Sequence, residues 1–135
     1  MRYFLELCLQ SVEAALVDIP SEIIVIDNNS KDDSCKMVKE QFPSVVLIQN
    51  TSNVGFSKAN NQAVKVAKGA YVCILNPDTV VAEDTFKTIL TFADTQTNLG
   101  IIGCRLIDGS GKFLPESKRN IPVVKIAIKK ILGNS

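Results

Sequence analysis

The spacing of apolar residues changes along the chain, and these changes predict helices that alternate with strands. Residues 2–16 carry apolar side chains at helical spacing, whereas residues 21–27 form a β-branched run that ends in Asp27. The two patterns then recur. The predicted helices are 2–16, 30–42, 56–69 and 82–95, and the predicted strands are 21–27, 44–50, 70–76 and 99–107. This alternation indicates an α/β fold with a parallel sheet and right-handed crossovers.

Local signals set the expected ends of these elements. Ser30 is a predicted N-cap, with Asp33 three residues on, and the helix that follows should end before Pro43. Gly69 is the predicted C-terminal cap of the next helix. The run at 21–27 is continuous rather than alternating, so it is expected to be buried on both faces of the sheet.

The last part of the chain predicts a hairpin and a basic tail. Residues 108–111, Asp-Gly-Ser-Gly, predict a turn after which 112–115 pair back as a short strand. The basic, apolar stretch 122–132 is a predicted helix. It would either lie on an anionic membrane as a peripheral contact or pack as a core helix, and the second reading is favoured.

Composition limits the classes of protein that fit. The chain has 135 residues, which suits one domain, and 46% of them are hydrophobic, enough for a sizeable core. The net charge of +1 argues against nucleic acid as a partner. There is no apolar run of membrane-spanning length. We therefore expect a folded domain whose chemistry lies in its loops.

Cysteine and histidine usage narrows that chemistry. The four cysteines form no C-x-x-C pair and the chain has no histidine, so a zinc site and a Ser-His or Cys-His nucleophile are disfavoured. Cys73 lies in an apolar run and is expected in the core. Scattered cysteines suggest a reducing cytoplasm. Carboxylates and metal ions remain as the candidate chemistry.

Three polar stretches follow three of the predicted strands: DNNS, NTSNVG and NPDT. The carboxyl ends of parallel strands are where such folds bind ligands. Asp27, followed by Asn28 and Asn29, could accept hydrogen bonds from a ribose or a base. The alternative is a helix-capping loop without a ligand.

The other two stretches suit phosphate and metal. Gly55 lets backbone approach a ligand at a helix N-terminus, where anions are favoured, although Lys58 there is also consistent with an ordinary loop. No G-x-G-x-x-G is present, which argues against a dinucleotide site. Asp78 could ligate a hard divalent cation, with Asn76 as a neutral hydrogen-bonding neighbour. Together the three loops predict a nucleotide-diphosphate site.

The ordered stretches EIIVIDNNSKDDS, IQNTSNVGFSKANNQAV, GAYVCILNPDTVV and IIGCRLIDGSGKF resemble successive motifs of the family 2 glycosyltransferases. The closest resemblance is to the rhamnosyltransferase-like branch and extends to about residue 120. It implies a three-layer, Rossmann-like GT-A fold, with a mostly parallel sheet flanked by helices. Residues 1–135 would form a single, incomplete GT-A domain that binds a nucleotide sugar.

The resemblance also implies roles for individual residues. Asp27 and Asn29 would contact the nucleotide. The nucleotide-sugar pocket would further include Asn53, Gly55, Asn60 and Asn76. Asp78, in the counterpart of the family's D-x-D motif, would bind Mg²⁺ or Mn²⁺. The implied reaction is an inverting, metal-dependent transfer from a UDP- or dTDP-sugar to a hydroxyl of a saccharide or lipid-linked saccharide, in bacterial cell-surface polysaccharide synthesis.

Two family features have no counterpart here, namely the opening strand before Met1 and the downstream acidic motif that supplies the catalytic base. The chain is therefore expected to be clipped at both ends, and the catalytic base stays unassigned. The alternative function is a nucleotide-sugar-binding fragment without turnover. A receiver-like signalling domain is disfavoured, because the carboxylate after the third strand lies beyond a proline. The open sheet edge favours a homodimer, and the expected location is the cytoplasm, at the inner face of the membrane.

Overall fold

The computed structural model describes residues 1–115, and they fall into two units, Met1–Thr95 and a second that begins at Gln96. The first unit holds all the regular helices and strands found in the described part of the chain. They are α1 (Arg2–Ala15), β1 (Ile24–Asp27), α2 (Ser34–Gln41), β2 (Val46–Gln49), α3 (Phe56–Val66) and α4 (Thr85–Asp94).

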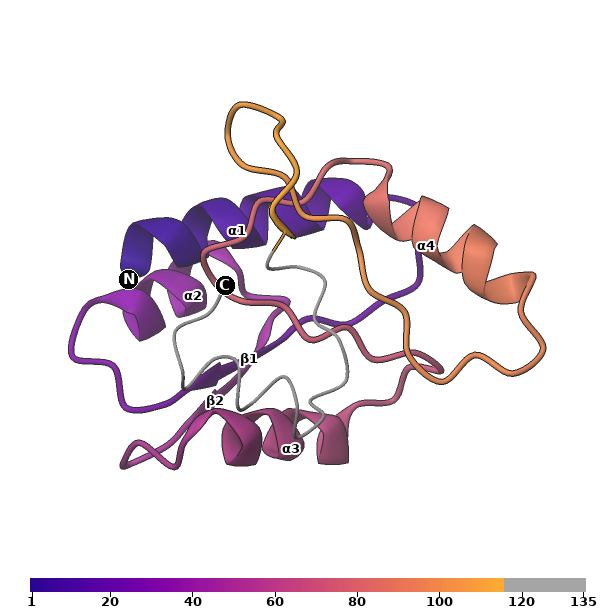
Figure 1. Ribbon diagram of the computed structural model, residues 1–135. Helices are drawn as coiled ribbons and strands as arrows, with labels where there is room; N and C mark the ends of the chain where they lie inside the picture. The colour runs from indigo at the N-terminus through magenta and orange to yellow at the C-terminus, as the bar shows by residue number, and fades with distance from the viewer. Residues whose placement is uncertain (116–135) are drawn as a thin grey trace, which may run out of the picture. The chain divides into compact units, whose positions relative to one another are not determined.

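β1 and β2 form a parallel pair, with Ile24 opposite Val46 and Asp27 opposite Gln49. Parallel neighbours need a crossover, and α2 supplies it. α1 and α2 lie on one side of the two strands and α3 lies on the other (Figure 1). The predicted α/β class and parallel pairing are confirmed for these elements, and both strands end at the same edge.

The core lies between α1, α2 and the strands. Its buried cluster comprises Leu9, Met37, Val38, Phe42 and Val45, and Leu5, Ile23, Val25 and Leu47 pack against it. Met37 and Val38 are the largest fully buried side chains. Burying each such side chain contributes roughly 1.5–3 kcal/mol, so α1 and the β1–α2–β2 unit together hold most of the apolar stabilisation.

Two predicted strands are not strands in the structure. Residues 70–76 form no ladder with β1 or β2, and of residues 99–107 only Ile107 makes a β-bridge. Cys73 is exposed, so its expected core position is wrong. β1 itself is half-buried rather than buried on both faces, because β2 is its only strand neighbour in the described chain. An apolar run becomes a strand only where a neighbouring backbone offers partners in register.

The helix ends also differ from the predicted ones. α2 begins at Ser34 with Asp33, not Ser30, as its N-cap, and the Asp32 carboxylate accepts hydrogen bonds from the N–H of Ser34, at 3.1 Å, and from its hydroxyl. α3 ends at Val66 and its C-cap is extended, so Gly69 does not cap it. These helices are therefore shorter than the periodic pattern suggested.

The second unit contains the predicted hairpin. Ile107 and Phe113 form an antiparallel bridge, and the N–H of Asp108 donates to the carbonyl of Lys112 at 2.8 Å. The Asp108 carboxylate accepts from its own turn, and Gly111 has φ of 81°. The predicted tail helix, 122–132, lies outside the described residues. None of the helices within residues 1–115 is both long and apolar enough for a membrane span.

Candidate functional site

The loops after β1 and β2, residues 27–30 and 50–55, lie together and are called the strand-end loops here. The N–H of Asn50 donates to the carbonyl of Asp27 at 2.9 Å, which continues the parallel pairing beyond the strands. Because these strands end at one edge, polar groups 25 residues apart come into contact. The prediction that these two loops converge is confirmed.

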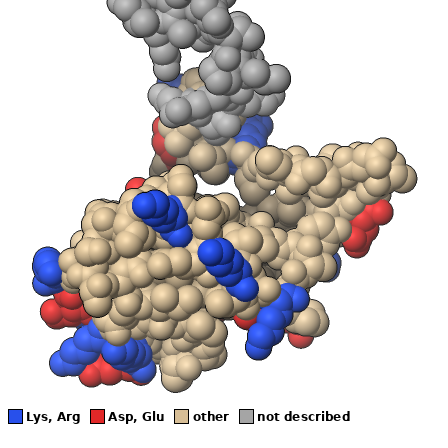
Figure 2. Space-filling view, turned by 90° about the horizontal axis from the view of Figure 1, so that it is seen from below, with Lys and Arg blue, Asp and Glu red and all other residues tan. Residues whose placement is uncertain are grey.

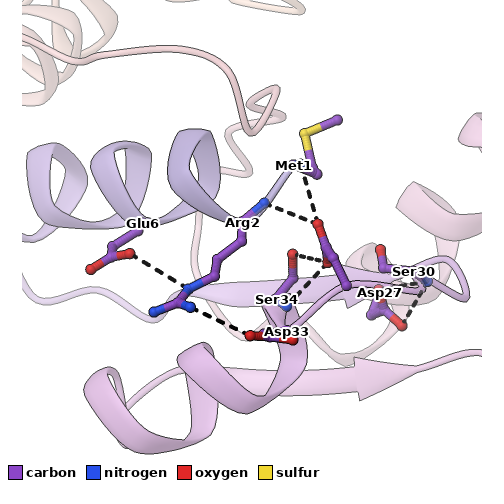
Figure 3. Close-up of polar contacts among 8 residues, drawn as sticks. Met1, Arg2, Glu6, Asp27, Ser30, Asp33 and Ser34 are labelled. Atoms are coloured by element: carbon purple, nitrogen blue, oxygen red, sulfur yellow. Dashed lines mark hydrogen bonds and ion pairs between the residues drawn. The ribbon is translucent and has the colours of Figure 1, made fainter.

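Asp27 is buried and ionised within its own loop. Its carboxylate oxygens accept from the N–H of Ser30 at 3.1 and 3.3 Å (Figure 3). Burial raises the pKa of this carboxyl, but hydrogen bonds from Ser30, from the Cys35 thiol and from Asn29 outweigh it and hold the pKa below its ordinary value. The side chain therefore caps the turn, as the ligand-free alternative expected, and presents a fixed negative charge at the sheet edge.

Asn29 and Gly55 occupy backbone conformations that few residues adopt. Asn29 has φ of 70°, and its side-chain oxygen accepts from Lys31 Nζ at 3.0 Å. Gly55 has φ of 86° and ψ of 158° at the N-cap of α3, and its N–H donates to Asn53 Oδ1 at 2.9 Å. Asn53 and Gly55 are both exposed. This edge thus offers accessible amide and backbone groups in fixed positions.

Asn60 points its amide back along its own helix. Its Nδ2 donates to the carbonyl of Phe56 one turn earlier, at 3.0 Å. Contacts of this kind hold the side chain against α3 and leave its carbonyl oxygen as the group available to a ligand.

The loop from Asn76 to Val81 is attached to α1. Cys8 Sγ donates to the carbonyl of Asn76 at 3.7 Å, and the N–H of Val81 donates to Ser11 Oγ at 3.1 Å. Burial raises the pKa of the Cys8 thiol, and the nearby negative charge of Asp78 raises it further. Asp78 is therefore close to α1. Within residues 1–115 no hydrogen bond or ion pair joins Asn76 or Asp78 to the strand-end loops.

The donor set at this loop limits the kind of metal site. No group of three or more His, Cys, Asp or Glu side chains in the described chain could hold a metal by itself. Asp78 supplies one carboxylate, and Mg²⁺ is commonly held by one or two carboxylates together with substrate phosphates. The residues therefore fit a hard divalent cation that binds with a diphosphate, rather than a closed protein cage.

Sequence reasoning missed the amides that join the strand-end loops. Asn28 Nδ2 donates to Asn53 Oδ1 at 2.8 Å, and Asn28 Oδ1 accepts from the N–H of Val54 at 2.9 Å. Asn50 and Gln62 bond to each other twice, at 2.9 and 3.0 Å. The available signal was an asparagine directly after each of two adjacent parallel strands, at Asn28 and Asn50.

The start of α1 is tied to the β1–α2 connection (Figure 3). The N–H of Arg2 donates to Asp32 at 3.1 Å, and its guanidinium lies 3.5 Å from Asp33 and 3.9 Å from Glu6. Such exposed pairs contribute about 0–1 kcal/mol each. Their effect is to place α1 beside the turn that Asp27 closes.

Basic side chains do not form one patch on the face that carries α3. In Figure 2 several Lys and Arg side chains are set apart by uncharged surface, and others lie beside acidic side chains. The sequence-based prediction that nucleic acid is not a partner stays a prediction.

Comparisons with known proteins agree on one family. The family model described as glycosyl transferase family 2 matches residues 3–134. The minor teichoic acid biosynthesis protein GgaB of Bacillus subtilis is 34% identical over 57% of this chain and 9% of its own length. The poly(ribitol-phosphate) beta-glucosyltransferase of Bacillus spizizenii is 29% identical over 93% of this chain and 21% of its own.

A third relative represents the branch suggested by the motifs. The N-acetylglucosaminyl-diphospho-decaprenol L-rhamnosyltransferase of Mycobacterium tuberculosis is 23% identical over 96% of this chain and 45% of its own length. The chain thus spans less than half of each of these relatives. No solved structure matches it. With nearly every residue inside the family match, this chain belongs to glycosyl transferase family 2, and its α/β architecture is part of that family's GT-A fold.

Proposed function

We propose that this chain is the donor-binding part of a glycosyltransferase that moves a sugar from a UDP- or dTDP-sugar to an acceptor hydroxyl, with inversion. The family match supports sugar transfer. The names of the relatives, which concern teichoic acid, poly(ribitol phosphate) and a diphospho-decaprenol-linked sugar, support bacterial cell-surface polysaccharide synthesis and a saccharide or lipid-linked saccharide acceptor.

The observation that carries the proposal is the convergence of the two strand-end loops. Asp27, whose carboxylate is ionised, precedes Asn28, and the Asn28 side chain bonds to Asn53 and to the N–H of Val54, next to Gly55. In the proposal Asp27 and Asn29 lie toward the base and ribose. Asn53, Gly55 and Asn60 line the rest of the nucleotide pocket, where the start of α3 favours negative charge.

Asp78 is the proposed protein ligand of Mg²⁺ or Mn²⁺, and Asn76 lies beside it. When bound, such an ion neutralises charge on the departing diphosphate as a Lewis acid. The attachment of this loop to α1 through Ser11 and Cys8 supports a fixed position for the carboxylate. The acceptor hydroxyl must also lose a proton to a general base, and no residue of this chain is assigned that role.

The second candidate function is nucleotide-sugar binding without turnover. It is the alternative because no general base is assigned among the residues that the structure describes. Cytoplasmic location, contact with the inner face of a membrane and homodimer formation also stay proposals. The membrane contact rests on residues 122–132, outside the described part of the chain.

Nucleotide titration tests the donor site. UDP and dTDP should bind in the presence of Mn²⁺ and much more weakly without it, as measured by isothermal calorimetry. Asp78→Ala should abolish the increase in nucleotide affinity that Mn²⁺ causes, because it removes the only carboxylate proposed to hold the ion. Asp94→Ala, which changes an exposed carboxylate at the end of α4, is the matched control and should bind like the parent.

Two results would contradict the assignment. Binding that does not depend on Mn²⁺, or Asp78→Ala binding like the parent, would remove Asp78 from the metal site. No binding of either nucleotide would remove the donor site altogether. If the nucleotides bind, measuring the free sugar released from the donor separates the two candidate functions. Nucleotide-sugar binding without turnover predicts no release.

A further inference from the structure

We infer that Asn28 is a positioning residue that sets the conformation of the donor pocket by joining its two loops. The inference rests on the proposed function. Asn28 follows β1 directly and is half-buried. Its side chain contacts the β2–α3 loop, although that loop lies 25 residues later in the chain.

Both ends of the Asn28 amide group are used. Nδ2 donates to the Asn53 side chain, and Oδ1 accepts from the Val54 backbone N–H and, at 3.4 Å, from Asn50 Nδ2. Asn53 Oδ1 in turn accepts from the N–H of Gly55. One side chain thus fixes three consecutive residues, 53–55, which lead into α3.

A second pair of side chains joins the start of the β2–α3 loop to α3. Asn50 pairs with Gln62 of α3 through two hydrogen bonds. The end of β2 and the body of α3 are therefore joined independently of Asn28. Asn28 additionally orders the exposed segment between β2 and α3, where Asn53 and Gly55 would contact the nucleotide.

The chemistry requires an amide at this position. Aspartate would place a carboxylate oxygen opposite Asn53 Oδ1, so that two acceptors would face each other, and alanine would leave both Asn53 and the Val54 N–H without this partner. An unfixed loop must be ordered when the ligand binds, which lowers affinity. Asn28 would therefore affect nucleotide affinity without touching the nucleotide.

The test measures loop order and affinity separately in Asn28→Ala and Asn28→Asp. Amide hydrogen exchange without ligand should become at least about tenfold faster at Val54 and Gly55 in Asn28→Ala and at Gly55 in Asn28→Asp, whose carboxylate still accepts from the Val54 N–H, while β1 and α2 exchange as in the parent. Affinity for UDP with Mn²⁺ should fall by about tenfold, the loss expected from one or two hydrogen bonds. Asn98→Ala changes an exposed asparagine outside this unit and should alter neither quantity.

A double-mutant cycle with Asn53→Ala examines the route of the effect. If Asn28 acts through the loop, its substitution should cost much less affinity once Asn53 is already alanine. Unchanged exchange at Val54 and Gly55 would overturn the inference whatever the nucleotide does. Faster exchange with unchanged UDP affinity would also overturn the inference, but it would not contradict the donor site. If the parent protein binds no nucleotide, the proposed function itself is contradicted.

Discussion

Asp27 has a structural role that can be stated from its contacts alone. Its carboxylate accepts from the backbone of Ser30 and from the Cys35 thiol, and these bonds close the turn after β1. A nucleotide contact would be a second role for the same charge. The two roles are compatible, because a carboxylate that is already oriented needs no rearrangement to accept a further hydrogen bond.

The pH dependence of unfolding should report this carboxylate. The pKa of Asp27 is below its ordinary value in the folded chain, so the unfolded chain binds more protons in the acid range. Asp27 therefore adds stability that is complete above about pH 5 and is lost as the pH falls through about 4 toward its folded pKa. Urea unfolding between pH 7 and pH 3 should show the loss.

Asp27→Asn isolates that contribution. Asp32 and Asp108 also have lowered pKa values, so the parent protein loses stability in acid for several reasons. The difference between the parent and Asp27→Asn should shrink as the pH falls, because the parent carboxyl becomes neutral too. A difference that stayed constant from pH 7 to pH 3 would contradict the ionised, hydrogen-bonded state of Asp27.

At the scale of elements, the start of α3 depends on one glycine. Gly55 combines φ of 86° with ψ of 158°, a region that residues with a Cβ rarely enter. A Cβ built there would meet no atom of a more distant residue within 4 Å, so the restriction comes from the local backbone conformation. The loop can turn into α3 in this way only with glycine at that position.

Gly55→Ala should therefore destabilise the fold by about 1–3 kcal/mol, the usual range for such backbone strain. Thermal or urea unfolding measures it. Gly103→Ala is the control, because a Cβ at Gly103 would also meet open space and its φ lies outside the positive region. Equal effects of the two substitutions would mean that the α3 entry tolerates a side chain.

Packing between the elements explains which of them could be predicted. α1, α2, β1 and β2 followed from periodicity, because each has an apolar face that packs on the shared core. Residues 70–76 have a comparable apolar run but are held through the next loop to α1, by Cys8 and Ser11, rather than by a strand ladder. Periodicity reports what a segment can bury and does not report which backbone lies beside it.

For the whole molecule, the sequence predicted that the two strand-end loops meet better than it predicted the residues that join them. Because parallel strands end at one edge of a sheet, Asp27 and Gly55 were predicted near the same edge. The structure confirms that their loops meet. Asn28 was missed because its importance comes from partners 25 and 26 residues away. Asp78 lies near Cys8 of α1, a neighbour that no local pattern reveals.

The distribution of the core has a consequence for how the chain opens. Every residue of the buried cluster lies between Leu9 and Val45, whereas α3 and α4 each bury one alanine, Ala59 and Ala93. Partial unfolding should thus begin at α4 and α3 and leave β1–α2–β2 folded. Native-state exchange would show the slowest amides in α2 and the strand pair, and equally slow amides in α4 would disprove this order. Half of the proposed pocket would then belong to a persistent subdomain and half to a segment that opens readily, so nucleotide should protect the α3 entry most.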